Sequence, residues 1–134
     1  MVKKKYTEEE RVARARAMRR EGYNCAQCVI LAFDDLLPSE SVDTAVLAAQ
    51  GFGSGYGGRG YVCGAVSGAN MVLGLTGSRP RPELYRLTGG IIDDFIAMEG
   101  AVDCSDLKKP GRKPCIDLIS DAVVILHRRI EDMV

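Results

Sequence analysis

The chain has 134 residues, with 18 Lys and Arg against 18 Asp and Glu, and therefore no formal net charge. This length predicts one domain over residues 1–134, and 46% hydrophobic residues are enough for a core without a metal or disulfide. A nucleic-acid partner is not expected, because phosphate binding normally requires an excess of basic residues. The opening MVKKKYTEEE has no apolar stretch behind its lysines, so we expect no secretory signal, no membrane insertion and a cytoplasmic location.

Helical signals run along the whole chain, and no segment alternates strictly enough to predict a strand. The first helix is expected to begin at Thr7, which forms a capping box with Glu10, and to stop at Gly22. The second helix is expected to be capped by Asn24 and to end before Pro38. It is apolar around most of its circumference, which predicts a central position.

The third helix is predicted to be short, over 42–50, with Ser41 as its cap. It is followed by GFGSGYGGRGYVCGAVSG, a stretch that holds eight of the 15 glycines and predicts a backbone with special conformational demands. The next helix, over about 63–75, carries Gly64 and Gly68 four residues apart. Small residues at this spacing let another helix or a ligand approach the backbone closely.

Two longer helices are expected in the rest of the chain. Apolar residues at helical spacing predict the first over 84–98, and breakers predict a loop over 99–113. Pro114 suits the first turn of a final helix, whose apolar repeat continues to Met133. We therefore expect an all-α, compact single-domain bundle of about five or six helices with a glycine-rich loop.

The five cysteines are the most informative chemistry in the sequence: Cys25, Cys28, Cys63, Cys104 and Cys115. An odd number in a cytosolic chain argues against a permanent disulfide framework. Cys25, Cys63 and Cys115 are each expected to open a helix, where free N–H groups and the helix dipole favour the thiolate. A thiolate is both the nucleophile of disulfide exchange and a ligand for soft metals, so this placement leaves both chemistries open.

Besides thiol redox chemistry at these helix starts, three other interpretations of the cysteines are open. Cys25 and Cys28 form Cys-x-x-Cys, but a thioredoxin-like site would need a preceding strand in a βαβ context. A zinc or iron–sulfur site could take four thiolates from Cys25, Cys63, Cys104 and Cys115, with Cys28 spare or substituting, although the spacing fits no zinc-finger or ferredoxin pattern. The third interpretation is that the cysteines are small, inert hydrophobic residues.

Two other features of the sequence could belong to a functional site. The G-x-G-x-x-G at 55–60 lacks the strand that a dinucleotide site requires. Free N–H groups near Cys63, together with Arg59, could still hold an anion or a thiol-bearing small molecule, whereas the competing interpretation assigns the glycines to tight turns. His127, the single histidine, lies too far along its helix from Cys115 to act as its base, and we expect it to complement the helix dipole.

Several stretches together resemble a known family: GYNCAQCVILAF, FGSGYGGRGYVCGAVSGANMVLGL, a loop cysteine and a cysteine that opens the last helix. They resemble the C_GCAxxG_C_C family, small proteins of about this length with four cysteines and a CGAxxG motif, here residues 63–68. The resemblance covers roughly 13–130 and implies a redox role. It assigns the four family cysteines to Cys25, Cys63, Cys104 and Cys115. Cys28 stands outside the family pattern.

The leading prediction is a cytosolic thiol redox protein. Cys63 or Cys25 is expected to be the exposed sulfur with a low pKa, and Cys104 and Cys115 are expected to be resolving or second-couple partners. The alternatives are a protein that binds a metal or iron–sulfur cluster through Cys25, Cys63, Cys104 and Cys115, and a helical interaction module with inert cysteines. A redox partner protein, a small thiol and a homo-oligomer are compatible with these predictions. The sequence specifies neither a substrate nor a catalysed reaction.

Overall fold

The computed structural model describes residues 5–133, which fold into helices joined by short connections. The α-helices are α1 (Glu8–Arg20), α2 (Cys25–Ala32), α3 (Ser39–Ala48), α4 (Gly64–Leu75), α5 (Arg81–Glu99), α6 (Cys104–Leu107) and α7 (Cys115–Asp132). The 3-10 helices are η1 (Asp34–Leu36) and η2 (Ala49–Phe52). Residues 5–133 contain no strand, only one isolated antiparallel bridge, so the all-α prediction is confirmed. Lys3 and Lys4 of the opening segment lie outside the described residues 5–133.

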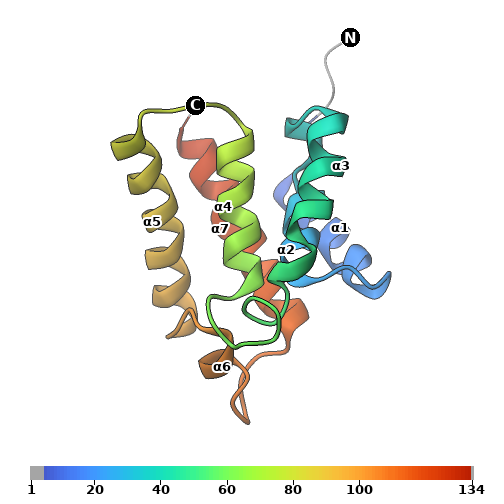
Figure 1. Ribbon diagram of the computed structural model, residues 1–134, viewed down its shortest axis with the longest axis vertical. Coiled ribbons are helices and arrows are strands. Elements are labelled where there is room, and N and C mark those ends of the chain that lie inside the picture. The colour runs from blue at the N-terminus through green and yellow to red at the C-terminus, as the bar shows by residue number, and fades with distance from the viewer. Residues whose placement is uncertain (1–4, 134) are drawn as a thin grey trace.

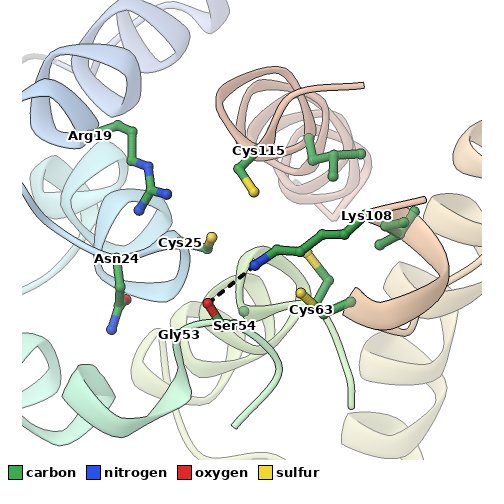
Figure 2. Close-up of a pocket in the computed structure, with 12 residues that line it drawn as sticks. Arg19, Asn24, Cys25, Gly53, Ser54, Cys63, Lys108 and Cys115 are labelled. Atoms are coloured by element: carbon green, nitrogen blue, oxygen red, sulfur yellow. Dashed lines mark hydrogen bonds between the residues drawn. The ribbon is translucent and has the colours of Figure 1, made fainter. Parts of the chain in front are cut away.

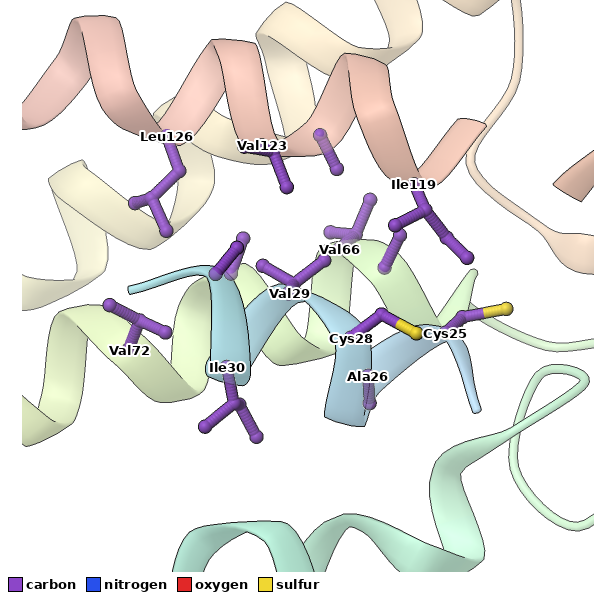
Figure 3. Packing of buried hydrophobic residues seen from close by; sticks show 14 of the residues in the cluster. Cys25, Ala26, Cys28, Val29, Ile30, Val66, Val72, Ile119, Val123 and Leu126 are labelled. Carbon is purple, nitrogen blue, oxygen red and sulfur yellow. The ribbon is translucent and has the colours of Figure 1, made fainter. Parts of the chain in front are cut away.

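The helices enclose one apolar core. Helix α4 packs on α2 and α5, and α7 packs on α1, α2, α4 and α5. Val29 of α2, Val66 of α4 and Val123 of α7 are fully buried where these three helices meet (Figure 3). The glycine-rich loop and α6 lie together at the end of the bundle where α4 and α7 begin (Figure 1). Within residues 5–133, no helix combines the length and apolar character needed to cross a membrane.

The two predicted capping boxes are present. Glu10 donates its backbone N–H to Thr7 Oγ1 at 3.1 Å, and the Thr7 N–H donates to the Glu10 carboxylate at 2.9 Å. Asn24 and Gln27 form the same reciprocal pair at the start of α2. These contacts are local in sequence, and each satisfies N–H groups that the first helical turn leaves without partners.

Two predicted boundaries are wrong. Helix α3 begins before Ser41, because the Pro38 carbonyl already accepts the first hydrogen bond of the helix, from the Val42 N–H at 3.1 Å, without a side-chain cap. The predicted loop over 99–113 contains the one-turn helix α6. Its first residue, Cys104, donates its backbone N–H to the Tyr61 carbonyl at 2.7 Å, so α6 is held by the glycine-rich loop, a partner distant in sequence.

Helices α2 and α4 approach each other through glycine, as the spacing of Gly64 and Gly68 predicted. A Cβ atom at Gly68 would lie 2.5 Å from the Ala26 carbonyl oxygen, far inside van der Waals contact. A Cβ atom at Gly64 would lie 2.9 Å from the Phe52 carbonyl oxygen and 3.1 Å from the Cys25 Cβ atom. The two glycines therefore bring the start of α4 against the start of α2.

A buried ion pair fixes α1 to the rest of the bundle. The Arg11 guanidinium is 3% exposed, forms a two-pronged contact with the Asp35 carboxylate and donates to the Ala32 carbonyl at 3.0 Å. Arg11 Nε donates to His127 Nδ1 at 3.0 Å. Since Arg can only donate, His127 Nδ1 is the acceptor of this hydrogen bond.

The contact between α2 and α4 can be tested with two glycine variants of one helix. Gly68→Ala is expected to lower the free energy of unfolding by about 1–3 kcal/mol, because the new methyl group overlaps the Ala26 backbone. Gly74→Ala is the matched control, since its Cβ atom meets nothing within 4 Å, and it should raise stability by about 0.5–1 kcal/mol. Urea denaturation measures both. Equal effects of the two variants would contradict the close packing.

Candidate thiol site

Four of the five cysteines line one pocket. It is a small space of about 60 Å³ at the end of the bundle, beneath the glycine-rich loop. Its lining residues are Arg19, Asn24, Cys25, Gly53, Ser54, Cys63, Gly64, Cys104, Leu107, Lys108, Cys115 and Leu118. Figure 2 shows Cys25, Cys63 and Cys115 reaching this space from three different segments of the chain. The residues that the family resemblance selected are therefore neighbours in space.

Each of these four cysteines stands at the beginning of a helix. Cys25 and Cys115 are the first residues of α2 and α7, and Cys63 is the residue that precedes α4. These positions agree with the prediction that the three residues open helices. Cys104 is the first residue of α6, although the sequence placed it in a loop. Four separate segments of the chain thus each contribute one thiol to the pocket.

Backbone pairing holds Cys63 and Cys104 beside each other. The isolated bridge joins Val62 to Asp103, the residues immediately before the two cysteines. The Cys63 N–H donates to the Val102 carbonyl at 2.8 Å, and the Cys104 N–H donates to the Tyr61 carbonyl at 2.7 Å. These residues belong to the backbone that leads into α4 and α6, so the bridge fixes both cysteines together.

Asn24 ties the glycine-rich loop to Cys25. Its side-chain oxygen caps α2, and its side-chain nitrogen donates to the carbonyls of Ala49 and Gln50 at 3.0 and 3.1 Å. The loop then passes so close that a Cβ atom at Gly53 would lie 3.1 Å from the Asn24 Cβ atom. One residue therefore begins the helix that carries Cys25 and positions the segment that covers it.

Two cations border the pocket. Arg19, from α1, donates to the Tyr23 carbonyl at 3.1 Å. The Lys108 side chain extends across the pocket in Figure 2, and its Nζ donates to Ser54 Oγ at 3.3 Å. Arg59, which the sequence suggested as the anion-binding residue, is exposed and does not line the pocket. The cations that line the pocket are therefore Arg19 and Lys108.

Cys28 lies elsewhere. Its side chain is fully buried among core residues, and its Sγ donates to the Tyr23 carbonyl at 3.6 Å (Figure 3). Burial is the main reason that the pKa of Cys28 is raised to about 12, with Arg19 opposing the rise. Cys28 thus behaves as a small hydrophobic residue, and Cys-x-x-Cys does not present both of its thiols to the pocket.

Burial also controls the ionisation of two pocket thiols. Desolvation raises the pKa of Cys63 to about 12, and the backbone N–H groups of Ala65 and Val66 act in the opposite direction. Desolvation is likewise the largest cause of the raised pKa of Cys25, followed by the Cys115 thiol, and Arg19 opposes both. The expected low pKa of Cys25 or Cys63 is therefore wrong, because burial outweighs the stabilisation that a helix start provides.

All five cysteines are free thiols. Within residues 5–133, no three His, Cys, Asp or Glu side chains are grouped in a way that could hold a metal ion. His127 does not line the pocket. It instead contacts Arg11 and Glu131, so the cysteines have no histidine base beside them.

Comparison with known proteins agrees with the geometry. Residues 23–129 match the family described as "Putative redox-active protein (C_GCAxxG_C_C)". The chain belongs to this family. The match contains all four pocket cysteines and the CGAxxG motif, residues 63–68. The motif has a structural meaning here, since its cysteine lines the pocket and its two glycines allow α4 to meet α2.

One relative is an uncharacterized protein of Archaeoglobus fulgidus. It is 26% identical over 132 residues, which cover 84% of this chain and 87% of the relative. No solved structure matches the chain. The similarity to this relative therefore extends over most of both chains.

Arg19, Lys108 and Ser54 border the pocket but were not selected from the sequence. Arg19 belongs to a run of interleaved charges that is typical of a solvated helix face, and Lys108 lies in the predicted loop. No local pattern distinguishes either side chain from its neighbours. Only the packing of α1 and α6 around the cysteines brings them to the site.

Thiol alkylation tests the accessibility and ionisation of the site. In the folded, reduced protein, iodoacetamide should modify the half-buried Cys115 first and the fully buried Cys28 last. Modification of Cys63 should be slow at neutral pH and accelerate about tenfold per pH unit toward pH 12, as its thiolate forms. Peptide mass spectrometry over a pH series measures this profile. A plateau for Cys63 below pH 9 would contradict the raised pKa.

Proposed function

We propose that this protein is a cytoplasmic thiol–disulfide redox protein that supplies electrons through Cys25, Cys63, Cys104 and Cys115. The observation that carries the proposal is the meeting of these four thiols in one pocket. Disulfide exchange requires one sulfur to attack another directly, so thiols that share a pocket can form couples. Four thiols provide two such couples, and a partner protein or a small thiol would reduce them again.

Cys25 is the central thiol of the proposed couples. The thiols of Cys115 and Cys104 contribute to its raised pKa, and Cys25 in turn contributes to that of Cys63. Cys104 contributes to the raised pKa of Cys63 as well, so Cys25 is the pocket thiol whose ionisation is linked to all three others. We assign it the role of exchange partner, with Cys104 and Cys115 as resolving or second-couple residues.

The raised pKa values indicate whether the proposed couples donate or accept electrons. A thiol of high pKa is a poor leaving group, so a disulfide that contains Cys63 is reduced slowly by attack that expels it. Its thiolate is also a strong nucleophile once formed. Both properties suit a protein that donates electrons and is left oxidised, rather than one that inserts disulfides into others.

Inert cysteines are the competing interpretation, and Cys28 illustrates what they look like. It is enclosed by core side chains and has no other cysteine with it in a pocket. The other four thiols share a pocket that Arg19 and Lys108 border. A purely structural role does not require thiols to gather around such a space, which is why we favour redox chemistry for these four.

A redox titration with mapped thiols tests the proposal. The protein should form disulfides among the pocket cysteines only, with a midpoint at or below about −270 mV, in the range of reducing thiol proteins. Cys28→Ala should leave the disulfides and the midpoint unchanged, whereas Cys25→Ala should remove at least one couple. The titration uses dithiothreitol buffers, followed by alkylation and peptide mass spectrometry. Disulfides that include Cys28, or no disulfide under any buffer, would contradict the proposal.

A further inference from the structure

The pocket holds more positive charge than its own residues neutralise. Neither Arg19 nor Lys108 has a carboxylate partner in the part of the chain that the structure describes, and no Asp or Glu lines the pocket. Some other basic side chains are paired, since Arg16 contacts Asp117 at 3.0 Å and Arg129 contacts Asp94 at 2.7 Å, but Arg19 and Lys108 are the two cations that line a pocket with four thiols. Two unpaired cations beside buried thiols point to a ligand that is an anion.

The size of the pocket restricts this anion to a few atoms. Its volume is about 60 Å³, and the contact between Lys108 and Ser54 crosses it. The thiols lie inside, since Cys25, Cys63 and Cys104 are 8%, 5% and 7% exposed. Because these three thiols are almost completely covered, a small inorganic anion reaches them more readily than a peptide-sized disulfide does.

We propose that the substrate of this thiol site is an inorganic polysulfide, a small anion with a sulfur–sulfur bond. The inference rests on the proposed redox function and names its substrate class. Arg19 and Lys108 hold the negative charge of the anion, and the pocket thiols attack its sulfur–sulfur bond. A polysulfide combines the three properties that suit this pocket: negative charge for the two cations, small size for the pocket volume, and a bond that thiols cleave.

The reaction balances without another reactant. For the hydrodisulfide ion HSS⁻, a protein thiol ionises beside Arg19 and Lys108, its thiolate attacks the protonated sulfur of the anion, and the departing sulfur takes up the proton that the thiol released. This step forms a protein persulfide and releases the hydrosulfide ion. A second pocket thiol then attacks the persulfide, forms a protein disulfide and releases hydrogen sulfide. Two thiols are oxidised by two electrons in total, and the sulfur–sulfur bond of the substrate is reduced.

The environment of the thiols agrees with this sequence of steps. Buried neutral thiols need a base, and the pocket has no carboxylate or histidine that could serve. The departing sulfur of the substrate, a much stronger base than the intact anion, takes up the thiol proton as the sulfur–sulfur bond breaks. Before the anion enters, burial keeps the pKa of Cys63 raised to about 12, so only a small fraction of this thiol is ionised at neutral pH.

Sulfide release from sodium tetrasulfide tests the inference, with reduced full-length protein in the absence of oxygen. Arg19→Gln and Lys108→Gln should each lower the second-order rate constant for sulfide release about tenfold, because each removes a charged contact to the anion. Arg20→Gln and Lys109→Gln are the matched controls, since these neighbouring side chains do not line the pocket. They should keep the rate of the unchanged protein, and circular dichroism checks that all four variants fold.

Two further oxidants separate this inference from the redox function. Glutathione disulfide, which is anionic but large, should oxidise the protein at least tenfold more slowly than tetrasulfide. Diamide, a small neutral oxidant, should form the pocket disulfides at rates that Arg19→Gln and Lys108→Gln do not lower. If diamide oxidises the protein but the rate with tetrasulfide does not depend on Arg19 or Lys108, the polysulfide inference alone is overturned. Equal rates with glutathione disulfide would overturn it as well, and failure of every oxidant would overturn both proposals.

Discussion

The close approach of α4 to α2 is the constraint on which the site depends. Gly64 and Gly68 leave no room for a Cβ atom against the backbone of Phe52 and Ala26, so the two helix starts meet directly. Cys63 and Cys25 stand at these starts and are carried into one pocket by the same contact. The family motif thus combines a reactive residue with the glycines that place it.

Around this contact, the glycine-rich loop assembles the rest of the site. Its beginning is held by Asn24, the cap of α2, and its end pairs with the segment before α6. The first pairing brings Ser54 to the pocket that Cys25 lines, and the second brings Cys104 and Lys108 to the same pocket. The loop is therefore a structural connector between distant cysteines, which explains why a G-x-G-x-x-G sequence occurs here without a preceding strand.

Local sequence signals were sufficient for much of the fold. The capping boxes at Thr7 and Asn24 each join residues three positions apart, and the small residues of α4 recur at a regular spacing. The structure contains both features. Helix α6 was missed because its start is held by Tyr61, more than 40 residues earlier in the chain. The pKa of Cys63 was predicted with the wrong sign, because a helix start is visible in the sequence whereas the depth of burial is not.

A native mass spectrum of the protein, purified without oxygen or added metal, tests the central claim most directly. Our account predicts a metal-free mass that falls by two hydrogen atoms for each disulfide when a mild oxidant is added, with Cys25, Cys63, Cys104 and Cys115 as the residues oxidised. A stoichiometric metal ion or cluster on these cysteines would make them ligands and contradict the account. A mass that does not respond to the oxidant would contradict it equally.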